Sequence, residues 1–221
     1  MQIKKTDIRP DDSLKKYRNS STSRQTKFLL YGVTGSGKTQ IYIEMALKIR
    51  ALGKQILILV PEIVLTGQLV TSFKEYFADD VAVIHSRLSV GERNDTFWRI
   101  RTKQVGIIIG ARSALFAPFE DLGLIVMDEE HDPSYKQDES PRYHSHDIIE
   151  KMAEIYHATL IMGSATPSLE SYYKAQIGEY VLLKMPNRID NLPLPYIEGV
   201  DMREELRMGN RKNYFFKTKK N

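Results

Sequence analysis

Short runs of apolar residues recur along the middle of the chain, separated by longer amphipathic stretches. Each run has six residues or fewer and is rich in Val, Ile and Leu. Because the runs are apolar on both faces, they predict strands that are buried on both sides of a parallel sheet. The predicted strands are residues 28–31, 56–60, 81–84, 105–109, 124–127 and 160–162.

The stretches between these runs have the spacing of helices. Between Lys38 and Leu52, apolar side chains fall near one broad face, and Gly53 follows as a stop signal. Similar patterns predict helices over residues 66–77, 90–101, 145–156 and 168–176. The repeated alternation of strand and helix predicts an α/β domain with a doubly wound, mostly parallel sheet and helices on both faces.

The two ends of the chain differ from this middle part. Residues 1–26 have no apolar period and are predicted to be poorly ordered, residues 27–185 form the predicted domain, and residues 186–221 are predicted to be a connecting segment with a basic tail. Residues 1–27 and 211–221 each carry a net charge of +5, whereas residues 28–210 carry −6. The overall charge of +4 is therefore a weak indication of nucleic-acid binding.

Composition narrows the class of protein. No apolar run approaches the roughly 20 residues of a membrane span, and the polar N-terminal residues do not form a secretory signal. The chain has no cysteine, which excludes disulfides and cysteine-ligated zinc and fits a reducing compartment. We expect a cytoplasmic protein that has no membrane association and no zinc.

A glycine-rich loop follows the first predicted strand and opens the first predicted helix. Its sequence, GVTGSGKT, has the spacing G-x-x-x-x-G-K-[ST]. Small residues let the backbone N–H groups turn toward a phosphate, Lys38 adds a charge for the β and γ oxygens, and the Thr39 hydroxyl is placed to coordinate Mg²⁺. The alternative is a glycine-rich turn with an incidental lysine. The predicted ATP-binding residues are Gly32, Thr34, Gly35, Ser36, Gly37, Lys38 and Thr39.

An acidic box, Asp-Glu-Glu-His, directly follows the predicted strand 124–127. A carboxylate at the carboxyl end of a buried strand projects into the crevice where such sheets bind ligands. Asp128 suits the Mg²⁺ role, Glu129 is placed to polarise an attacking water, and Lys38 completes the predicted catalytic set. The alternative is a solvated acidic loop.

Two hydroxyl residues, Ser164 and Thr166, follow the predicted strand 160–162. At that strand end they are placed to hydrogen-bond the acidic box and to report the state of the γ-phosphate. The alternative is a helix N-cap and turn before Ser168, which the same residue types favour. The order of the three motifs favours the functional interpretation.

This order of motifs resembles the first motor domain of superfamily 2 helicases, and the surrounding residues are most similar to the PriA-type replication-restart helicases. The stretches that carry the resemblance are LLYGVTGSGKTQIYIE, LVPEIVLTGQL, HSRLSVGER, GARSALFAPF, DEEHDPSYKQDESPRYHSHD and GSATPSLES, within residues 28–210. The resemblance implies a RecA-like P-loop NTPase domain of an ATP-driven 3′→5′ motor. It also implies single-stranded or forked DNA as substrate, and primosome proteins and single-strand-binding protein as partners of the full-length family.

The resemblance implies further residue roles. His131, Ser164 and Thr166 would couple the state of ATP to DNA. In segment 132–147, rings would stack on unpaired bases while cations meet phosphates, although a polar surface loop is the alternative. The residues placed on the DNA by the resemblance are Pro61, Gln68, His85, Ser86, Arg112, Ser113, Tyr135, Lys136, Arg142 and Tyr143.

Parts of the family pattern are not recognisable in the chain. Only 31 residues precede Gly32, the adenine-recognising glutamine segment is not evident in Lys15–Lys27, and a second motor domain with an arginine finger and zinc clusters is absent. An arginine finger contributes about 10³–10⁵ in rate, so we expect a truncated chain that binds ATP·Mg²⁺ and, weakly, DNA, with little turnover and no unwinding. The alternatives are another P-loop NTPase such as a kinase, a superfamily 2 translocase, and a nucleotide-binding module that does not unwind DNA.

Overall fold

The computed structural model describes residues 26–62, 67–189, 203 and 207. The chain divides into two units, Met1–Asn191 and Leu192–Asn221, and all elements described below belong to the first. Most of the predicted end segments 1–26 and 186–221 therefore lie outside the described residues. The predicted start of a helix at residue 66 also lies outside them.

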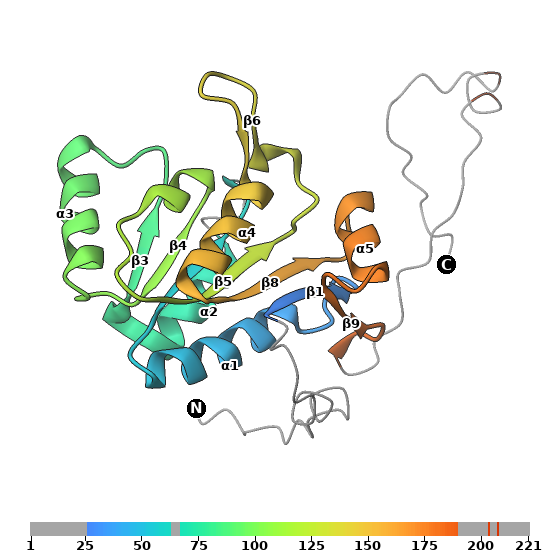
Figure 1. The fold of residues 1–221 in the computed structure, drawn as a ribbon, viewed down its shortest axis with the longest axis horizontal. Helices are drawn as coiled ribbons and strands as arrows, with labels where there is room; N and C mark the ends of the chain where they lie inside the picture. The colour runs from blue at the N-terminus through green and yellow to red at the C-terminus, as the bar shows by residue number, and fades with distance from the viewer. Residues whose placement is uncertain (1–25, 63–66, 190–202, 204–206, 208–221) are drawn as a thin grey trace. The chain divides into compact units, whose positions relative to one another are not determined.

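A seven-stranded sheet forms the centre of the domain, and all of its strand pairings are parallel. The strand order is β3-β4-β2-β5-β8-β1-β9 (Figure 1). All six predicted strands are present, and β9 is a seventh that the hydrophobic pattern did not predict. The bounds are β1 Lys27–Gly32, β2 Gln55–Leu59, β3 Val81–Ile84, β4 Ile107–Gly110, β5 Leu122–Asp128, β8 Thr159–Ser164 and β9 Val181–Met185.

Five α-helices connect the strands, at the places predicted from the sequence. The third begins with a capping box, in which Ser89 and Glu92 each accept a hydrogen bond from the other's backbone N–H. Within the described ranges, every helix is too short or too polar to cross a membrane. The helices are α1 Lys38–Ala51, α2 Gln68–Phe77, α3 Val90–Arg101, α4 Ser145–Tyr156 and α5 Leu169–Gln176, and the 3-10 turns are η3 Ala78–Asp80, η4 Arg112–Phe116 and η5 Pro133–Tyr135.

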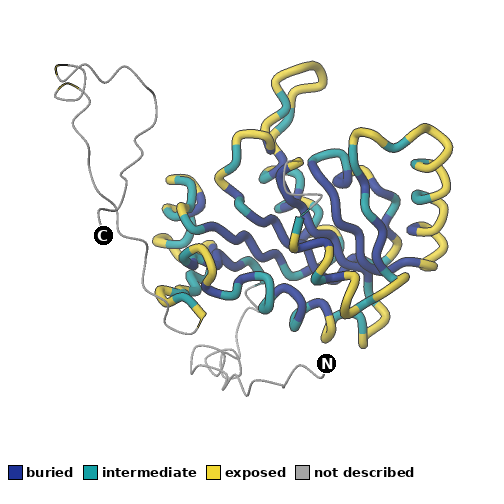
Figure 2. Tube along the Cα trace, turned by 180° about the vertical axis from the view of Figure 1, so that it is seen from behind, coloured by how far each residue is buried: buried dark blue, intermediate teal, exposed yellow. Residues whose placement is uncertain are grey.

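The sheet separates two hydrophobic cores, which explains why its strands are apolar on both faces. Leu57 and Ile125 belong to one core, together with Ile149 of α4. Ile58 and Val126, the next residue along each strand, belong to the other core, together with residues of α1 and α2. Successive side chains of a strand point to opposite faces, so each strand supplies both cores. Figure 2 shows the strands as the buried centre of the domain.

The parallel arrangement brings the carboxyl ends of all seven strands to one edge of the sheet. The loop after β1, the end of β5 and the end of β8 carry the three motifs identified in the sequence. In the strand order, β5, β8, β1 and β9 are consecutive neighbours. The motifs therefore lie side by side although about 90 and 130 residues separate the second and third from the first.

A two-stranded antiparallel hairpin follows the acidic box. Its strands are β6 Lys136–Gln137 and β7 Tyr143–His144, and α4 begins at the next residue. The hairpin projects from the domain in Figure 1, and its tip is exposed in Figure 2. The sequence predicted this segment as a loop, because two-residue strands leave no recognisable alternation.

Candidate nucleotide site and neighbouring groove

The phosphate loop joins β1 to α1 through two left-handed glycines. Gly35 has φ +80° and Gly37 has φ +91°, a region that favours glycine because it lacks a Cβ. The N–H of Ser36 donates to the carbonyl of Val33 at 3.0 Å, which closes the turn. No side chain caps the start of α1, so the first N–H groups of that helix face the loop. This geometry suits an anionic ligand.

Lys38 is held inside the loop, with 8% of its surface exposed. Its Nζ donates to the carbonyl of Gly32 at 2.8 Å. The Ser36 hydroxyl is buried and has no hydrogen-bond partner among the described residues. A buried cation and an unpaired buried hydroxyl, together with free helix N–H groups, fit the oxygen atoms of a polyphosphate.

Asp128 ends β5 and is 9% exposed. Burial raises the pKa of its carboxyl group, and the hydrogen bond from Tyr42 partly opposes this. The Tyr42 hydroxyl donates to Asp128 Oδ1 at 2.9 Å. Gly163 pairs with Asp128 across the sheet, and a Cβ on Gly163 would lie 1.7 Å from the Tyr42 oxygen. Glycine at position 163 is thus what lets Tyr42 reach the carboxylate.

The backbone turns sharply after Asp128. Glu129 has φ +45°, in the left-handed region that non-glycine residues rarely adopt. This turn directs the Glu129 side chain toward the phosphate loop, where it lines the same pocket as Asp128, while Glu130 is buried in the interior. His131 Nδ1 lies 3.7 Å from Glu129 Oε2.

His131 joins the acidic box to the Ser-Ala-Thr motif, as predicted from the sequence. Its Nδ1 lies 2.8 Å from the Ser164 hydroxyl, and its Nε2 lies 3.3 Å from the Thr166 hydroxyl. The N–H of Thr166 also donates to Ser164 Oγ at 2.9 Å. The three side chains therefore form one hydrogen-bonded group between the ends of β5 and β8.

Glu130 is the centre of a buried network that the sequence did not indicate. Its carboxylate accepts hydrogen bonds from Ser168 N–H, Ser168 Oγ and Ser171 Oγ at 2.7, 3.0 and 2.8 Å, and lies 2.8 Å from His146 Nε2. Burial alone would raise the pKa of Glu130, but these hydrogen bonds outweigh it and leave the pKa lowered. The network fastens the acidic box to the start of α5 and to α4. Its only sequence signal was a third carboxylate within the box.

A pocket of about 480 Å³ surrounds these groups. It is lined by residues 34–40 of the phosphate loop, by Asp128 and Glu129, and by Ile189. One wall comes from α2, which begins at Gln68, so the structure places this residue beside the phosphate loop, and its predicted DNA contact stays a prediction. The residues of that wall are Gln68, Leu69, Ser72, Glu75 and Tyr76.

Tyr135 is the first aromatic residue of the segment predicted to stack on bases. It is 1% exposed, and its hydroxyl donates to the carbonyl of Asp128 at 2.7 Å. Its own carbonyl accepts from Ser145 Oγ at 2.7 Å. The predicted stacking role of Tyr135 is therefore wrong, because an enclosed ring offers no face to a base. Its hydroxyl instead stabilises the backbone of the acidic box at Asp128.

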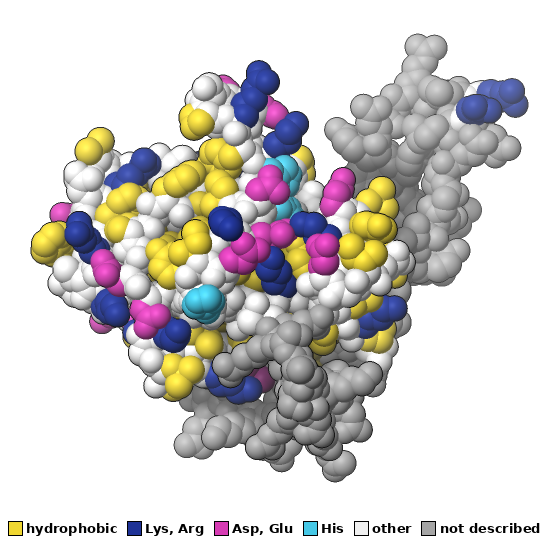
Figure 3. Space-filling view, viewed as in Figure 1, with side chains coloured by type: hydrophobic (Ala, Val, Ile, Leu, Met, Phe, Trp, Pro, Cys, Tyr) yellow, Lys and Arg dark blue, Asp and Glu magenta, His cyan; other side chains and the backbone are white. Residues whose placement is uncertain are grey.

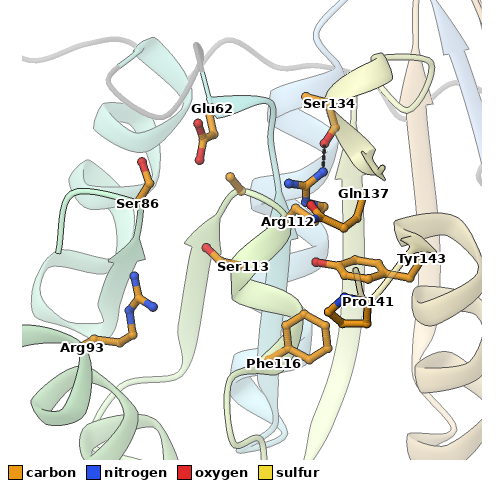
Figure 4. Close-up of a pocket in the computed structure, with 11 residues that line it drawn as sticks. Glu62, Ser86, Arg93, Arg112, Ser113, Phe116, Ser134, Gln137, Pro141 and Tyr143 are labelled. Atoms are coloured by element: carbon orange, nitrogen blue, oxygen red, sulfur yellow. Dashed lines mark hydrogen bonds between the residues drawn. The ribbon is translucent and has the colours of Figure 1, made fainter. Parts of the chain in front are cut away.

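A second pocket, of about 580 Å³, lies at the same edge of the sheet beside the hairpin. Figure 4 shows Glu62, Ser86 and Arg93 on one side, Phe116 and Tyr143 on the other, and Arg112 and Ser113 between them. We call this pocket the groove. Its lining residues are Glu62, Ser86, Arg93, Ala111, Arg112, Ser113, Phe116, Ser134, Gln137, Pro141 and Tyr143.

Arg112 holds the hairpin against the groove. Its Nη1 donates to the carbonyl oxygens of Ser134, at 3.2 Å, and Lys136. Its guanidinium carbon lies 5.9 Å from the centre of the Tyr143 ring, which in turn makes an edge-to-face contact with Phe116 at 5.5 Å. Two buried polar atoms that line the groove, Arg93 Nε and Ser113 Oγ, have no partner among the described residues.

Four of the residues that the resemblance placed on DNA meet in this groove: Ser86, Arg112, Ser113 and Tyr143. Pro61 is buried and does not line the groove, so its predicted DNA contact stays a prediction. His85 is half-buried next to Ser86, and its buried Nδ1 has no partner among the described residues. The groove also contains Arg93 and Phe116, which the sequence did not single out.

Lys136 and Arg142 lie on the hairpin outside the groove lining, and both contact the same acidic residue. Lys136 Nζ lies 3.0 Å from the Asp138 carboxylate, and Arg142 Nε donates to the Asp138 carbonyl at 3.0 Å. Both side chains are exposed. Figure 3 shows Lys and Arg side chains on the projecting hairpin.

Comparison with known proteins identifies the family to which the chain belongs. A family model described as DEAD/DEAH box helicase matches residues 17–175. The chain is 54% identical over 184 residues to the replication restart protein PriA of Bacillus subtilis, covering 83% of this chain and 23% of the relative. It is 46% identical over 188 residues to the PriA of Synechocystis, with the same two coverages. The chain thus spans about a quarter of the length of these curated relatives.

A solved structure resembles the fold. The helicase domain of Pyrococcus furiosus Hef superposes with a TM-score of 0.52 and 20% sequence identity, over 80% of this chain and 38% of that one. At this identity the likeness bears on the fold alone. It agrees with the predicted doubly wound, RecA-like architecture.

Proposed function

The chain belongs to the DEAD/DEAH box helicase family, and on that basis we propose that it is an ATP-binding motor lobe of a PriA-type replication-restart helicase. The observation that carries the proposal is the hydrogen-bonded group of His131, Ser164 and Thr166 beside the phosphate loop. A small-molecule kinase needs a phosphate loop but has no use for a second motif that contacts the acidic box. A motor needs such a contact to transmit the state of its nucleotide.

The proposed ligand is ATP with Mg²⁺. Lys38 and the N–H groups of residues 34–39 other than that of Ser36 would bind the phosphate oxygens, and Thr39 and Asp128 would hold Mg²⁺. When bound, the cation would neutralise phosphate charge. Burial raises the pKa of Asp128 and so disfavours its charged form. The charge of Lys38 opposes this effect, and a bound Mg²⁺ would oppose it in the same way.

Glu129 is the proposed base that orients water for attack. Its side chain lines the pocket with the phosphate loop, and 35% of that side chain is exposed, so water reaches it. Asp128, in contrast, is held by Tyr42 and is almost fully buried. The two adjacent carboxylates therefore have different environments, which suits one to a metal and the other to water.

The proposed DNA site is the groove, together with the exposed cations of the hairpin, Lys136 and Arg142. Arg93 and Arg112 would meet phosphates, and the rings of Phe116 and Tyr143 offer surfaces to unpaired bases. Ser86 and Ser113 add hydroxyl groups for the backbone. Single-stranded or forked DNA is the proposed substrate. The proposed partners, which the resemblance implies for the full-length family, are primosome proteins and single-strand-binding protein. The proposed location is the cytoplasm.

The coupling between the two sites provides the test. We expect single-stranded DNA to raise the steady-state ATPase rate of the purified chain, and Lys38→Ala to abolish both ATP binding and that rate. A rate that single-stranded DNA leaves unchanged would favour a kinase or another P-loop NTPase. An unchanged ATP affinity in Lys38→Ala would show that the nucleotide site is elsewhere.

A further inference from the structure

The chain returns to the phosphate loop after the last strand of the sheet. The N–H of Val33 donates to the carbonyl of Met185 at 3.2 Å, and the N–H of Ile189 donates to the carbonyl of Gly35 at 3.0 Å. Two backbone hydrogen bonds thus fasten residues 185–189 to both halves of the loop's turn. We call these five residues the β9 extension.

The side chains of the β9 extension contact the loop at its second glycine. A Cβ on Gly37 would lie 3.3 Å from Ile189 Cδ1, so the glycine leaves room for the isoleucine to approach. Ile189 lines the nucleotide pocket and is nevertheless 53% exposed. Arg188 is half-buried, and its buried Nε has no partner among the described residues.

The strand order indicates which end of a nucleotide would meet this segment. Asp128 lies at the end of β5, two strands from β1, on one side of the phosphate loop. The β9 extension follows the strand on the other side of β1. Because the proposed function places Mg²⁺ and the γ-phosphate beside the carboxylates, the opposite end of the ligand would leave the loop toward β9.

We propose that the β9 extension forms the base-side wall of the nucleotide pocket, with Ile189 packed against the purine and Arg188 beside the ribose and α-phosphate. The proposal rests on the proposed function, since it assigns the remainder of the same ligand. An exposed isoleucine gains most from a planar apolar partner, because the contact removes apolar surface from water. Arg188 offers a planar cation, which suits a phosphate or the edge of a base.

The rival base wall is α2, on the carboxylate side of the pocket. Tyr76 lines the pocket from there and is 53% exposed, so its ring is also available to a base. The two walls make different predictions, since a base on α2 would depend on Tyr76 and be indifferent to Ile189.

The experiment measures equilibrium binding of ATP and of inorganic tripolyphosphate to the full chain by titration calorimetry. In Ile189→Ala we expect ATP to bind about five- to twentyfold more weakly, because the alanine leaves part of the base exposed to water. Tripolyphosphate has no base and should bind within twofold of its affinity for the unsubstituted chain. Ile189→Leu should restore most of the ATP affinity. Ile177→Ala is the matched control, because Ile177 is 52% exposed at the end of α5 and does not line the pocket.

Four outcomes overturn the proposal. Unchanged ATP affinity in Ile189→Ala, with weaker binding in Tyr76→Ala, would place the base on α2. Equal weakening for ATP and tripolyphosphate would make Ile189 a support of the loop, and tighter ATP binding would make it an obstruction. If the unsubstituted chain does not bind ATP at all, the proposed function fails together with this inference, whereas the first three results leave the proposed function standing.

Discussion

The nucleotide pocket and the groove lie at the same edge of one sheet but are built differently. The pocket takes its central groups from one continuous loop and one strand end, and Lys38 and Asp128 are both more than 90% buried with fixed hydrogen-bond partners. The groove is assembled from the ends of separate strands and from the hairpin. Its cations, Arg93 and Arg112, are half-buried on its surface.

This difference determines how each region should respond to substitution. A buried polar group that loses its partner bears the full desolvation cost, so single changes around Asp128 should have large effects. A groove that binds through several half-buried groups divides its affinity among them, and water replaces part of any one contact. We therefore expect the largest effects beneath the nucleotide pocket and the smallest in the groove.

The strongest test of the buried region is Gly163→Ala. The added Cβ would lie 1.7 Å from the hydroxyl of Tyr42, a residue with no exposed surface. We expect the unfolding free energy to fall by about 3 kcal/mol, through overpacking and disruption of the hydrogen bond to Asp128. Denaturant unfolding followed by circular dichroism measures this change.

Gly91→Ala is the control for that substitution. Gly91 lies in the first turn of α3, and a Cβ there would meet nothing within 4 Å. Alanine favours the helix, so stability should be unchanged or rise by less than about 1 kcal/mol. A similar decrease in both variants would show that the Tyr42–Asp128 contact is not the reason for glycine at position 163.

Glu130→Gln should have the next largest effect. The substitution removes the negative charge of the carboxylate that makes four polar contacts. It also places an amide NH₂ donor next to other hydrogen-bond donors. We therefore expect the unfolding free energy to decrease by about 2 kcal/mol at neutral pH. The exposed Glu139→Gln on the hairpin, which faces solvent, serves as the control and should change nothing measurable.

The difference between Glu130→Gln and the unsubstituted chain should depend on pH. Since the pKa of Glu130 is lowered in the folded state, its carboxylate stabilises the fold above the ordinary pKa near 4.5, and this contribution disappears as the pH falls through the folded value. Unfolding measured from pH 7 down to pH 3 should therefore show the two curves converging below about pH 4.5. A constant difference across this range would contradict the assignment of the effect to the charge.

The groove should show the smallest single effect. Arg112→Gln removes one cation and its contacts with the hairpin, and we expect affinity for single-stranded DNA to fall about tenfold, with the salt dependence reduced by about one counterion. Fluorescence anisotropy at several salt concentrations measures both. Arg101→Gln, an exposed arginine of α3 outside the groove, is the control. Weaker binding with unchanged salt dependence would point to a structural role for Arg112 in placing the hairpin.

The same difference explains what the sequence could predict. The phosphate loop depends on spacing within eight residues, and the strand and helix patterns around it are local, so the loop and six of the seven strands were predictable. His131 and Ser164 were also predicted to meet, because parallel strands end at a common edge. These predictions used only neighbours in the chain or a rule of sheet topology.

The sequence could not predict which side of an element a residue faces. Gln68 lies on a helix that turns it toward the phosphate loop, and Tyr135 lies in a 3-10 turn that buries it beneath Asp128. A motif match records such residues but not their direction. Strand β9 was missed although Val181, Leu182 and Leu183 form an apolar run as long as the predicted strand 160–162; it is only partly buried and lies at the edge of the sheet.

The left-handed backbone at Glu129 has a consequence for design. A β-carbon in that region costs on the order of 1 kcal/mol, which glycine would avoid. A procedure that selects residues for stability alone would therefore replace Glu129 with glycine. The resulting protein would be more stable but would lack the carboxylate proposed to act on water. At this position glycine would favour backbone stability, whereas glutamate would favour the proposed chemistry. Selection for stability and selection for turnover would therefore favour different residues.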